Sequence, residues 1–317
     1  MSQGRALEML ANPAVDAAER AAIAASALTG RGDKIAADQA AVDAMRTGLN
    51  AMAMTGRIVI GEGERDEAPM LFIGEEVGDG QGPEIDIALD PLEGTSLTAK
   101  GMNNALAVLA LAPRGGLLHA PDTYMDKIAC GPGLPPGVID LDASPAENAA
   151  AIARAKGVKP DALTACVLDR ERHEAIVESL RSVGVRIMMI ADGDVAGVIN
   201  AADPDGDADL YIGRGGAPEG VLGAAALKCL GGQMQGRLHF RTSEERERAA
   251  RVGLSDLDRK YDLDGLASQD CLFIAAGVTE GDLVHGVRHG AGYVETETLL
   301  LSSVSGLRRK IRTRRPV

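Results

Sequence analysis

The stretch from Asp90 to Thr95, Asp-Pro-Leu-Glu-Gly-Thr, places two carboxylates and a hydroxyl within six residues. It follows an apolar run, Ile85 to Leu89, whose length and composition predict a buried strand. Hard cations such as Mg²⁺ prefer oxygen ligands, and the end of a strand holds such ligands rigidly. Gly94 and Thr95 would offer backbone N–H groups to an anion. The segment therefore predicts a site for cations, a phosphate and an attacking water, which phosphoryl hydrolysis requires.

The alternative for this stretch is a structural turn in which Asp90 accepts a hydrogen bond from its own loop. Such a turn needs one polar side chain, whereas Asp90, Glu93 and Thr95 supply three. We therefore favour the functional interpretation, with Asp90 and Glu93 as cation ligands. Thr95 is too weak a base to deprotonate water alone, so it would pass the proton to a carboxylate such as Glu62.

Two earlier segments could add to the same site. Lys34 ends a Gly-Arg-Gly-Asp-Lys connection between two predicted helices, and Asp38 follows one turn later. Lys34 would bind a phosphate and Asp38 a cation, unless this is only a C-cap glycine and a polar loop. Glu62, in Gly61-Glu62-Gly63-Glu64, follows a predicted strand, and the alternating glycines would let a ligand approach closely. We expect Glu62 to bind a cation or orient the water; the alternative is an acidic hairpin turn.

Polar side chains also follow two predicted strands of the second half. Asp192-Gly193-Asp194 comes after the run Val185 to Ile190, at the carboxyl end where α/β sheets bind ligands. These carboxylates suit sugar hydroxyls, although Asp194 could also be a helix N-cap. Arg170 and Arg172 could bind a phosphate bidentately, and a solvated first helical turn explains them equally well.

A glycine-rich loop from Gly213 to Gly220 enters another predicted helix, Pro218 to Leu230, a pattern typical of an anion cradle. It lacks the Gly-Lys-Ser/Thr of a P-loop. Glu219 lies at the start of that helix. It is either a metal ligand from the second half of the chain or a charge that complements the helix macrodipole.

The predicted elements change character along the chain. The first half has helices and then a run of strands, which suggests α+β. The helices are Pro13 to Leu28, with Asn12 as N-cap, and Ala36 to Thr55; the strands are Arg57 to Ile60, Ala105 to Leu111, Leu117 to His119 and Tyr124 to Cys130. Ser144 opens a capping box whose helix stops at Gly157. Strands and helices then alternate, which predicts a mainly parallel sheet. We expect an α/β protein with domains 1–157 and 158–317, the last strand and tail returning to the first.

Composition excludes several classes of function. The chain has 317 residues, 45% hydrophobic and 25% charged, without tryptophan and with a net charge of -13, so nucleic-acid binding is not expected. Met1 to Asn12 does not predict a signal peptide, and no apolar run approaches 18 residues, so no membrane span is expected. Four cysteines far apart in apolar segments suit a reduced, cytoplasmic protein. The basic tail, Arg308 to Val317, is interpreted as a frayed terminus or a subunit contact.

These segments together resemble the class II fructose-1,6-bisphosphatases. The matching stretches are GRGDKIAAD, IVIGEGERDEAPMLFIGEEVG, DIALDPLEGTSLTAKGMNNALAVLA, APDTYMDKI, IADGDVAGVI and GGAPEGVLGAAALKCLGG, with weaker similarity to about residue 311. The resemblance implies layers in the order α/β/α/β/α, an outline shared with inositol monophosphatases, and two or more Mg²⁺ or Mn²⁺ ions. The implied metal ligands are Asp38, Glu62, Asp90, Glu93 and Glu219. The implied substrate contacts are Glu93, Gly94, Thr95, Tyr124, Arg170, Arg172, Asp192, Gly193, Asp194 and Gly216. Lys34 would reach the scissile phosphate, which makes Lys34, Asp38, Glu62 and Thr95 the expected catalytic residues.

The expected reaction is hydrolysis of the 1-phosphate of fructose 1,6-bisphosphate to fructose 6-phosphate. A second activity on sedoheptulose 1,7-bisphosphate is the closest alternative. An inositol monophosphatase activity is disfavoured because that family's Trp-Asp motif is missing. A non-catalytic sugar-phosphate sensor would need neither Thr95 nor Glu62. We also expect a homo-oligomer, a dimer or a tetramer.

Overall fold

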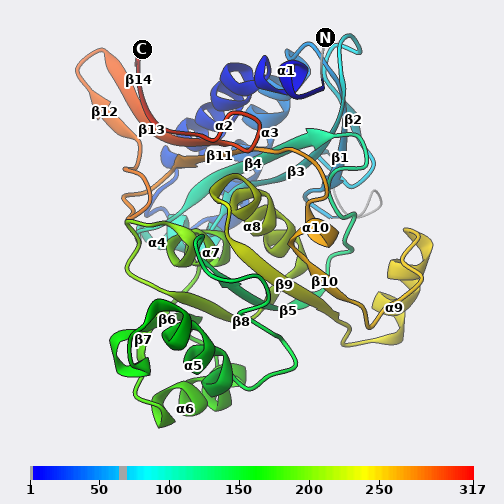
Figure 1. Ribbon diagram of the computed structural model, residues 1–317. Coiled ribbons are helices and arrows are strands. Elements are labelled where there is room, and N and C mark those ends of the chain that lie inside the picture. The colour runs from blue at the N-terminus through cyan, green and yellow to red at the C-terminus, as the bar shows by residue number, and fades with distance from the viewer. Residues whose placement is uncertain (1–2, 64–69) are drawn as a thin grey trace. The chain divides into compact units, whose positions relative to one another are not determined.

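The computed structural model describes residues 3–63 and 70–317 (Figure 1). The chain divides into two compact units, the first made of Met1–Leu117 with Gln269–Val317 and the second of Leu118–Ser268. The sequence had suggested a boundary after Gly157. The division falls earlier because the strand after Leu118 pairs within the second unit. Glu64 lies outside the described residues.

The first unit contains an eight-stranded sheet. Its order is β12-β13-β11-β4-β3-β1-β2, with β14 paired to β13. Among its described strands, β1 and β3 form the parallel pair, and the other neighbours are antiparallel. The strands are β1 (Thr55–Ile60), β2 (Glu76–Val77), β3 (Glu84–Glu93), β4 (Leu106–Pro113), β11 (Leu272–Gly277), β12 (Arg288–Gly290), β13 (Tyr293–Ser302) and β14 (Leu307–Pro316). The helices are α1 (Gln3–Glu8), α2 (Ala11–Ser26), α3 (Lys34–Asn50) and α4 (Thr95–Lys100).

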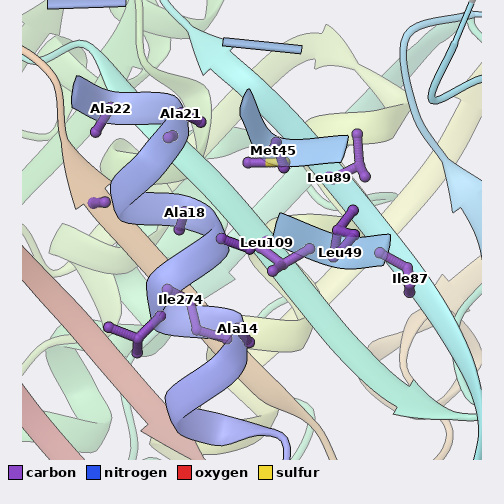
Figure 2. Packing of buried hydrophobic residues seen from close by; sticks show 14 of the residues in the cluster. Ala14, Ala18, Ala21, Ala22, Met45, Leu49, Ile87, Leu89, Leu109 and Ile274 are labelled. Atoms are coloured by element: carbon purple, nitrogen blue, oxygen red, sulfur yellow. The ribbon is translucent and has the colours of Figure 1, made fainter. Parts of the chain in front are cut away.

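The alanine-rich helix α2 packs closely on both α3 and the sheet (Figure 2). Ala14, Ala18 and Ala21 are fully buried and present short side chains to their neighbours. A Cβ added at Gly48 of α3 would lie 2.7 Å from Cα of Ala17. The two helices therefore approach at backbone distance, which fixes α3 and the residues at its start against the sheet.

Some element boundaries in this unit differ from the predicted ones. Helix α2 begins at Ala11, and its N-cap is Leu10 without a side-chain bond, so the prediction of Asn12 as N-cap was wrong. Helix α3 begins after Asp33, whose side chain accepts a hydrogen bond from the Ala36 N–H at 3.0 Å, and it ends at Asn50 instead of Thr55. The strand expected from Leu117 to His119 is reduced to a single bridge at Leu117.

The basic tail forms strand β14, so its interpretation as a frayed terminus was wrong. Arg312 and Arg314 lie opposite Glu297 and Glu295 of β13, with N–O distances of 3.1 and 2.8 Å. Arg315 pairs with the buried Glu19 of α2 at 2.5 Å. Cross-strand pairs of opposite charge favour this register. The basic residues are therefore built into the sheet and held by acidic partners.

The second unit contains a six-stranded mixed sheet in the order β10-β9-β5-β8-β6-β7. Its strands are β5 (Tyr124–Cys130), β6 (Thr164–Leu168), β7 (Arg186–Ile190), β8 (Leu210–Gly216), β9 (Gln233–His239) and β10 (Lys260–Asp262). Only β7, β6 and β8 are parallel, so the prediction of a mainly parallel sheet was wrong. The reason is that β5 and β9 enter the sheet antiparallel beside β8.

Helices cover both faces of this sheet. Helices α5 (Pro145–Lys156) and α6 (Glu174–Ser182) pack through Ile152 and Leu180 on one face. Helices α7 (Asp194–Ala202) and α8 (Ala217–Leu230) pack on each other and on β5 and β8. The remaining helices are α9 (Ser243–Arg251), α10 (Leu263–Leu266) and the short 3₁₀ turns η1 (Pro160–Ala162) and η2 (Glu171–His173). The α/β fold class is confirmed, with alternating elements from β6 to α8.

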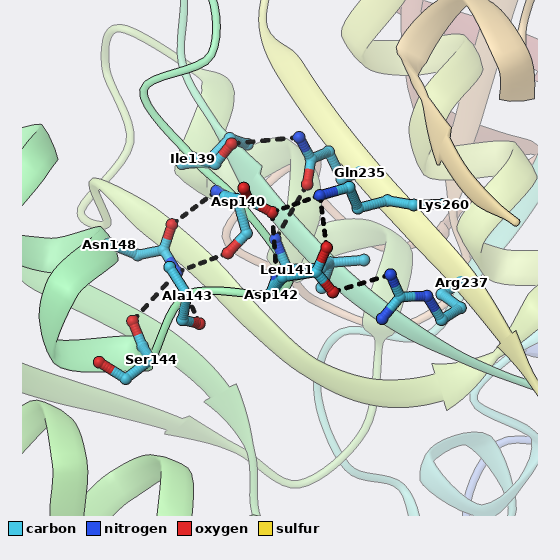
Figure 3. A network of polar contacts seen from close by, with 10 residues as sticks. All are labelled: Ile139, Asp140, Leu141, Asp142, Ala143, Ser144, Asn148, Gln235, Arg237 and Lys260. Carbon is cyan, nitrogen blue, oxygen red and sulfur yellow. Dashed lines mark hydrogen bonds and ion pairs between the residues drawn. The ribbon is translucent and has the colours of Figure 1, made fainter. Parts of the chain in front are cut away.

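The connection from β5 to α5 is tied to the edge of the second sheet (Figure 3). Lys260 donates to Asp140 at 2.5 Å and to Asp142 at 2.7 Å, and Arg237 donates to Asp142 at 2.8 Å. The capping box of Ser144 forms as predicted and starts α5. These bonds anchor the segment before α5 to β9 and β10. In the described part of the chain no helix is long and apolar enough to cross a membrane.

Candidate active site

The opening motif lies at the end of β3, and the strand runs through it. Pairing with β4 shifts between Asp90 and Glu93, so the strand bulges at this point. The Leu92 N–H donates to the Asp90 carboxylate at 3.0 Å, as in the structural alternative for this stretch. Glu93 is buried. Gly94 has a φ of +91° and starts α4, whose first residue is Thr95. The bulge and the glycine therefore turn the chain sharply between the carboxylates and the hydroxyl.

Glu62 follows the neighbouring parallel strand at the same end of the sheet. Ile60 of β1 pairs with Ala88 of β3, and Glu62 and Asp90 each lie two residues further on. Burial, together with the nearby charge of Asp38, raises the pKa of Glu62 to about 7. Burial also raises the pKa of Asp38. The fold thus gathers carboxylates whose mutual repulsion and desolvation a cation would relieve.

The Lys34 segment packs beside the helix that begins at Thr95. The N–H groups of Gly30 and Gly32 donate to carbonyls of Thr98 and Ala99 at 2.9 Å each. Lys34 is the exposed first residue of α3, and Asp38 lies one turn further along it. The three segments of the first unit that carry predicted site residues are therefore neighbours in the structure.

In the second unit the predicted glycine-rich loop is the end of strand β8, so its description as a loop was wrong. The glycines instead make room for charged side chains. A Cβ at Gly215 would lie 2.0 Å from Oδ2 of Asp194, and one at Gly216 would lie 1.9 Å from Oε2 of Glu219. Burial raises the pKa of Glu219, although the nearby Lys127 ammonium acts to lower it. Two glycines are therefore needed where carboxylates approach the strand.

Lys127 of β5 is a member of this cluster that the sequence reasoning did not find. Its side chain is fully buried, with a relative exposure of 0%. Its ammonium forms an ion pair with Asp194 and donates to the Gly216 carbonyl at 2.8 Å. The available signal was a lone lysine in an apolar strand that runs from Tyr124 to Cys130. A buried lysine needs such partners, because an unpaired charge in an apolar interior is strongly unfavourable.

Asp194 is the first residue of α7 and not its N-cap, which is Gly193 with a φ of +89°. Asp192, just before it, is partly exposed and lies 3.9 Å from the Arg170 guanidinium. Arg170 also donates to the Ala191 carbonyl at 2.7 Å. The segment that starts α7 therefore presents one buried and one accessible carboxylate.

Tyr124 and Arg172 lie together at the same end of the second sheet. The Arg172 guanidinium is 5.1 Å from the centre of the Tyr124 ring and donates to the Arg214 carbonyl. His173 has a structural role, because its ring contacts the Leu168 carbonyl and the Arg214 N–H, each at 2.8 Å. Tyr124 and Gly216 are partners in the register of β5 and β8. Three predicted substrate contacts, Tyr124, Arg172 and Gly216, are therefore close together within the second unit.

A divalent cation such as Mg²⁺ needs several oxygen ligands. Within residues 3–63 and 70–317, no group of three or more His, Cys, Asp or Glu side chains forms a preassembled metal site. In that same part of the chain, Oε2 of Glu219 and Oδ1 of Asp194 are buried and accept no hydrogen bond. Buried carboxylate oxygens without a donor fit a hard cation better than they fit an apolar core.

Comparisons with known proteins agree with this chemistry. The family model described as "Bacterial fructose-1,6-bisphosphatase, glpX-encoded" matches residues 8–315. The chain is 45% identical, over 92% of its length and 91% of the relative's, to the D-fructose 1,6-bisphosphatase class 2/sedoheptulose 1,7-bisphosphatase of Synechococcus sp. (strain JA-3-3Ab). It is 44% identical to the fructose-1,6-bisphosphatase 1 class 2 of Escherichia coli (strain K12), over 93% and 91%.

Among solved structures, the extragenic suppressor protein suhB of Bartonella henselae matches 61% of this chain and 71% of its own, with 12% identity and a TM-score of 0.34. The family match covers nearly the whole chain. The chain therefore belongs to the class II, glpX-type fructose-1,6-bisphosphatases, a family of metal-dependent phosphatases.

Proposed function

We propose that this phosphatase hydrolyses the 1-phosphate of fructose 1,6-bisphosphate and that two or more Mg²⁺ or Mn²⁺ ions are required. The observation that carries the proposal is the family match from residue 8 to 315, which includes every predicted site residue. Glu62 and Asp90, which follow β1 and β3 at the same end of the sheet, support it from the structure, as does the charge of Asp38 that acts on Glu62. Bound cations supply charge neutralisation of the phosphoryl oxygens.

The residues of the first unit have different roles at the reacting phosphate. Asp38, Glu62, Asp90 and Glu93 hold cations. Glu219, which belongs to the second unit, is also proposed as a cation ligand. Thr95 orients the attacking water, and Glu62 accepts its proton. The position of Glu62, two residues beyond the β1–β3 pair and level with Asp90, supports that choice.

Other groups bind the substrate without taking part in proton transfer. Lys34 binds the scissile phosphate, and the backbone at Gly94 offers N–H groups to it. Asp192, Gly193 and Asp194 bind sugar hydroxyls, with Gly216 beside them. The remaining contacts, at the second phosphate, are Tyr124, Arg170 and Arg172.

A second substrate is favoured by a specific observation. The Synechococcus relative is named for both fructose 1,6-bisphosphatase and sedoheptulose 1,7-bisphosphatase activity. We therefore include the seven-carbon bisphosphate as an alternative substrate. Phosphate release from each bisphosphate, with Mg²⁺ or Mn²⁺ and then with EDTA, tests both proposals. Release that persists in excess EDTA would contradict the cation requirement, and a purified protein inactive on both substrates would contradict the function.

Two substitutions test the roles within the site. Asp90→Asn should lower turnover far more than it lowers stability, because it removes a cation ligand. Normal turnover of that variant at saturating Mg²⁺ would remove Asp90 from the site. Thr95→Ala should lower kcat more than it raises KM. If only KM changes, Thr95 is a substrate contact and does not orient the water.

The setting of the enzyme is part of the proposal. We propose that it works in the cytoplasm as a homo-oligomer, a dimer or a tetramer. The free cysteines support a reducing compartment, because Cys130, Cys166 and Cys271 are buried and none of the four forms a disulfide. Light scattering of the purified chain distinguishes a monomer from either assembly.

A further inference from the structure

The Tyr124 ring lies close to two guanidinium groups. The central carbon of the Arg172 guanidinium is 5.1 Å from the ring centre, and that of Arg241 is 4.7 Å from it. Arg241 follows the end of β9, whose His239 pairs with Tyr124 of β5. The two guanidinium carbons can be no farther apart than these two distances added together. An anion placed between two guanidinium groups can accept hydrogen bonds from both.

Arg172 has no acidic partner in the described part of the chain. Its Nε and Nη2 both donate to the main-chain carbonyl of Arg214, at 3.1 and 2.8 Å. No carboxylate among residues 3–63 and 70–317 lies within ion-pair distance of it. The residue is exposed at the surface of the second unit. Its positive charge is therefore available to a ligand.

Arg241 is fixed in place by the buried Glu245 of α9. Its Nε and Nη2 donate to Oε1 of Glu245 at 2.8 and 2.6 Å, and its backbone N–H donates to Oε2 at 2.6 Å. Thr123 donates to the same carboxylate at 3.0 Å. Burial would raise the pKa of Glu245, but these hydrogen bonds lower it to about 2. The pair therefore stays ionised at every pH at which the enzyme would be assayed.

The opposite edge of the Arg241 guanidinium is unused. The side chain is 53% exposed, and Nη1 donates no hydrogen bond within the described residues. Asp122 is the other acidic group that acts on Arg241, and it does so without a hydrogen bond. A guanidinium held by one edge presents its remaining N–H groups in fixed directions, which suits the oxygens of a phosphate ester.

We propose that Arg241 is a further substrate-binding residue that, with Arg172 and Tyr124, grips the phosphate that is not hydrolysed. The inference rests on the proposed function, since it assumes a bisphosphate substrate. Glu245 is then a positioning residue, because it acts only through Arg241. The phosphate dianion would accept hydrogen bonds from both guanidinium groups beside the Tyr124 ring.

The test compares two substrates that differ only in the second phosphate. For Arg241→Gln we expect kcat/KM with fructose 1,6-bisphosphate to fall by a factor of about 10 to 100, as for loss of a hydrogen bond to a charged group. With fructose 1-phosphate, which lacks the second phosphate, the same substitution should change kcat/KM by less than about threefold. A structural role would lower both values equally, and that result, or no change in either, would overturn the proposal.

Arg246→Gln is the matched control. Arg246 also lies over an aromatic ring, that of Phe240 at 5.2 Å, and pairs with Asp258, so its loss should affect neither substrate. If Arg241→Gln does not fold, Arg241→Lys keeps the positive charge but lacks the planar guanidinium that can bind two oxygens. The same selective loss of kcat/KM with fructose 1,6-bisphosphate is then expected. Binding of fructose 6-phosphate in EDTA, followed by calorimetry, needs no turnover and should weaken about tenfold or more in Arg241→Gln. An inactive wild type that still shows this difference would refute the proposed function alone.

Discussion

Removing divalent cations should reveal that the Glu62 carboxylate is buried unfavourably. Its pKa rises from 4.5 to about 7 in the folded chain, through burial and then through the charge of Asp38. Between these two pH values the folded chain holds a proton that the unfolded chain has already released. Stability from this group is therefore complete below about pH 4.5, falls as the pH rises, and is lost above about pH 7.

The size of the effect follows from the same two pKa values. Each tenfold change in proton affinity corresponds to about 1.4 kcal/mol, so the difference from 4.5 to about 7 amounts to about 3 kcal/mol. Glutamine has nearly the same shape and no proton to lose. The free energy of unfolding of the wild type, taken relative to Glu62→Gln, should therefore decrease by most of that amount between pH 5 and pH 8.

Urea unfolding in EDTA at several pH values measures this difference. Subtracting the Glu62→Gln profile removes the contribution of other titrating groups. Asp38→Asn is a second control, and it should shrink the pH dependence because the smaller of the two causes is gone. Added Mg²⁺ should restore stability at pH 8 in the wild type more than in Glu62→Gln. Parallel wild-type and Glu62→Gln profiles in EDTA would refute this account of Glu62.

Three further predictions concern other parts of the molecule. Lys127→Met should lower the free energy of unfolding by about 3–5 kcal/mol, because Asp194 loses its buried partner. In urea unfolding, adding Asp194→Asn to that variant should recover part of the loss. If the losses from the two substitutions simply add in the double variant, the pairing is contradicted. Gly216→Ala should raise the KM for substrate and weaken Mg²⁺ binding measured by calorimetry, because the new Cβ would displace Glu219. An unchanged Mg²⁺ affinity would show that β8 can shift to make room for the Cβ. Glu19→Gln should lower the midpoint of thermal unfolding by a few degrees, since it breaks the ion pair that holds the last strand; the loss should persist in 1 M salt because Glu19 is buried.

Sequence reasoning predicted best the elements whose signals are local. The capping box at Ser144, the strand from Tyr124 to Cys130 and the helix that follows Gly216 are all where the sequence placed them, apart from a residue or so at their ends. These depend on caps, turns and apolar runs that a short window contains. The α/β class followed from them.

Pairing between distant segments could not be predicted in this way. Nothing near Gly213 to Gly216 indicates that the segment extends a strand, because its glycines serve Asp194 and Glu219 from two different helices. The basic tail is a strand only because Glu295 and Glu297 lie opposite it. In each case the deciding partner lies on another element.

The residues of the candidate site also differ in whether a local motif could indicate them. Asp38 was proposed from the glycine-rich connection before its helix, and Glu62 and Asp90 were proposed because each follows a strand directly. Lys127 and Arg241 were missed, because a single basic residue gains meaning only from the buried carboxylates it meets, Asp194 and Glu245.

The division of the chain has a consequence for how the protein is made. The first unit is completed only by Gln269–Val317, which supply β11, β13 and β14, whereas the second unit is one continuous segment, Leu118–Ser268. We expect the second unit to fold during synthesis, because all its strands lie in one continuous segment. Strand β4, by contrast, can pair with β3 on one side early, but its other edge stays unpaired until β11 is made. We expect chaperones to bind the emerging chain at this unpaired edge of β4, which β11 covers in the finished enzyme.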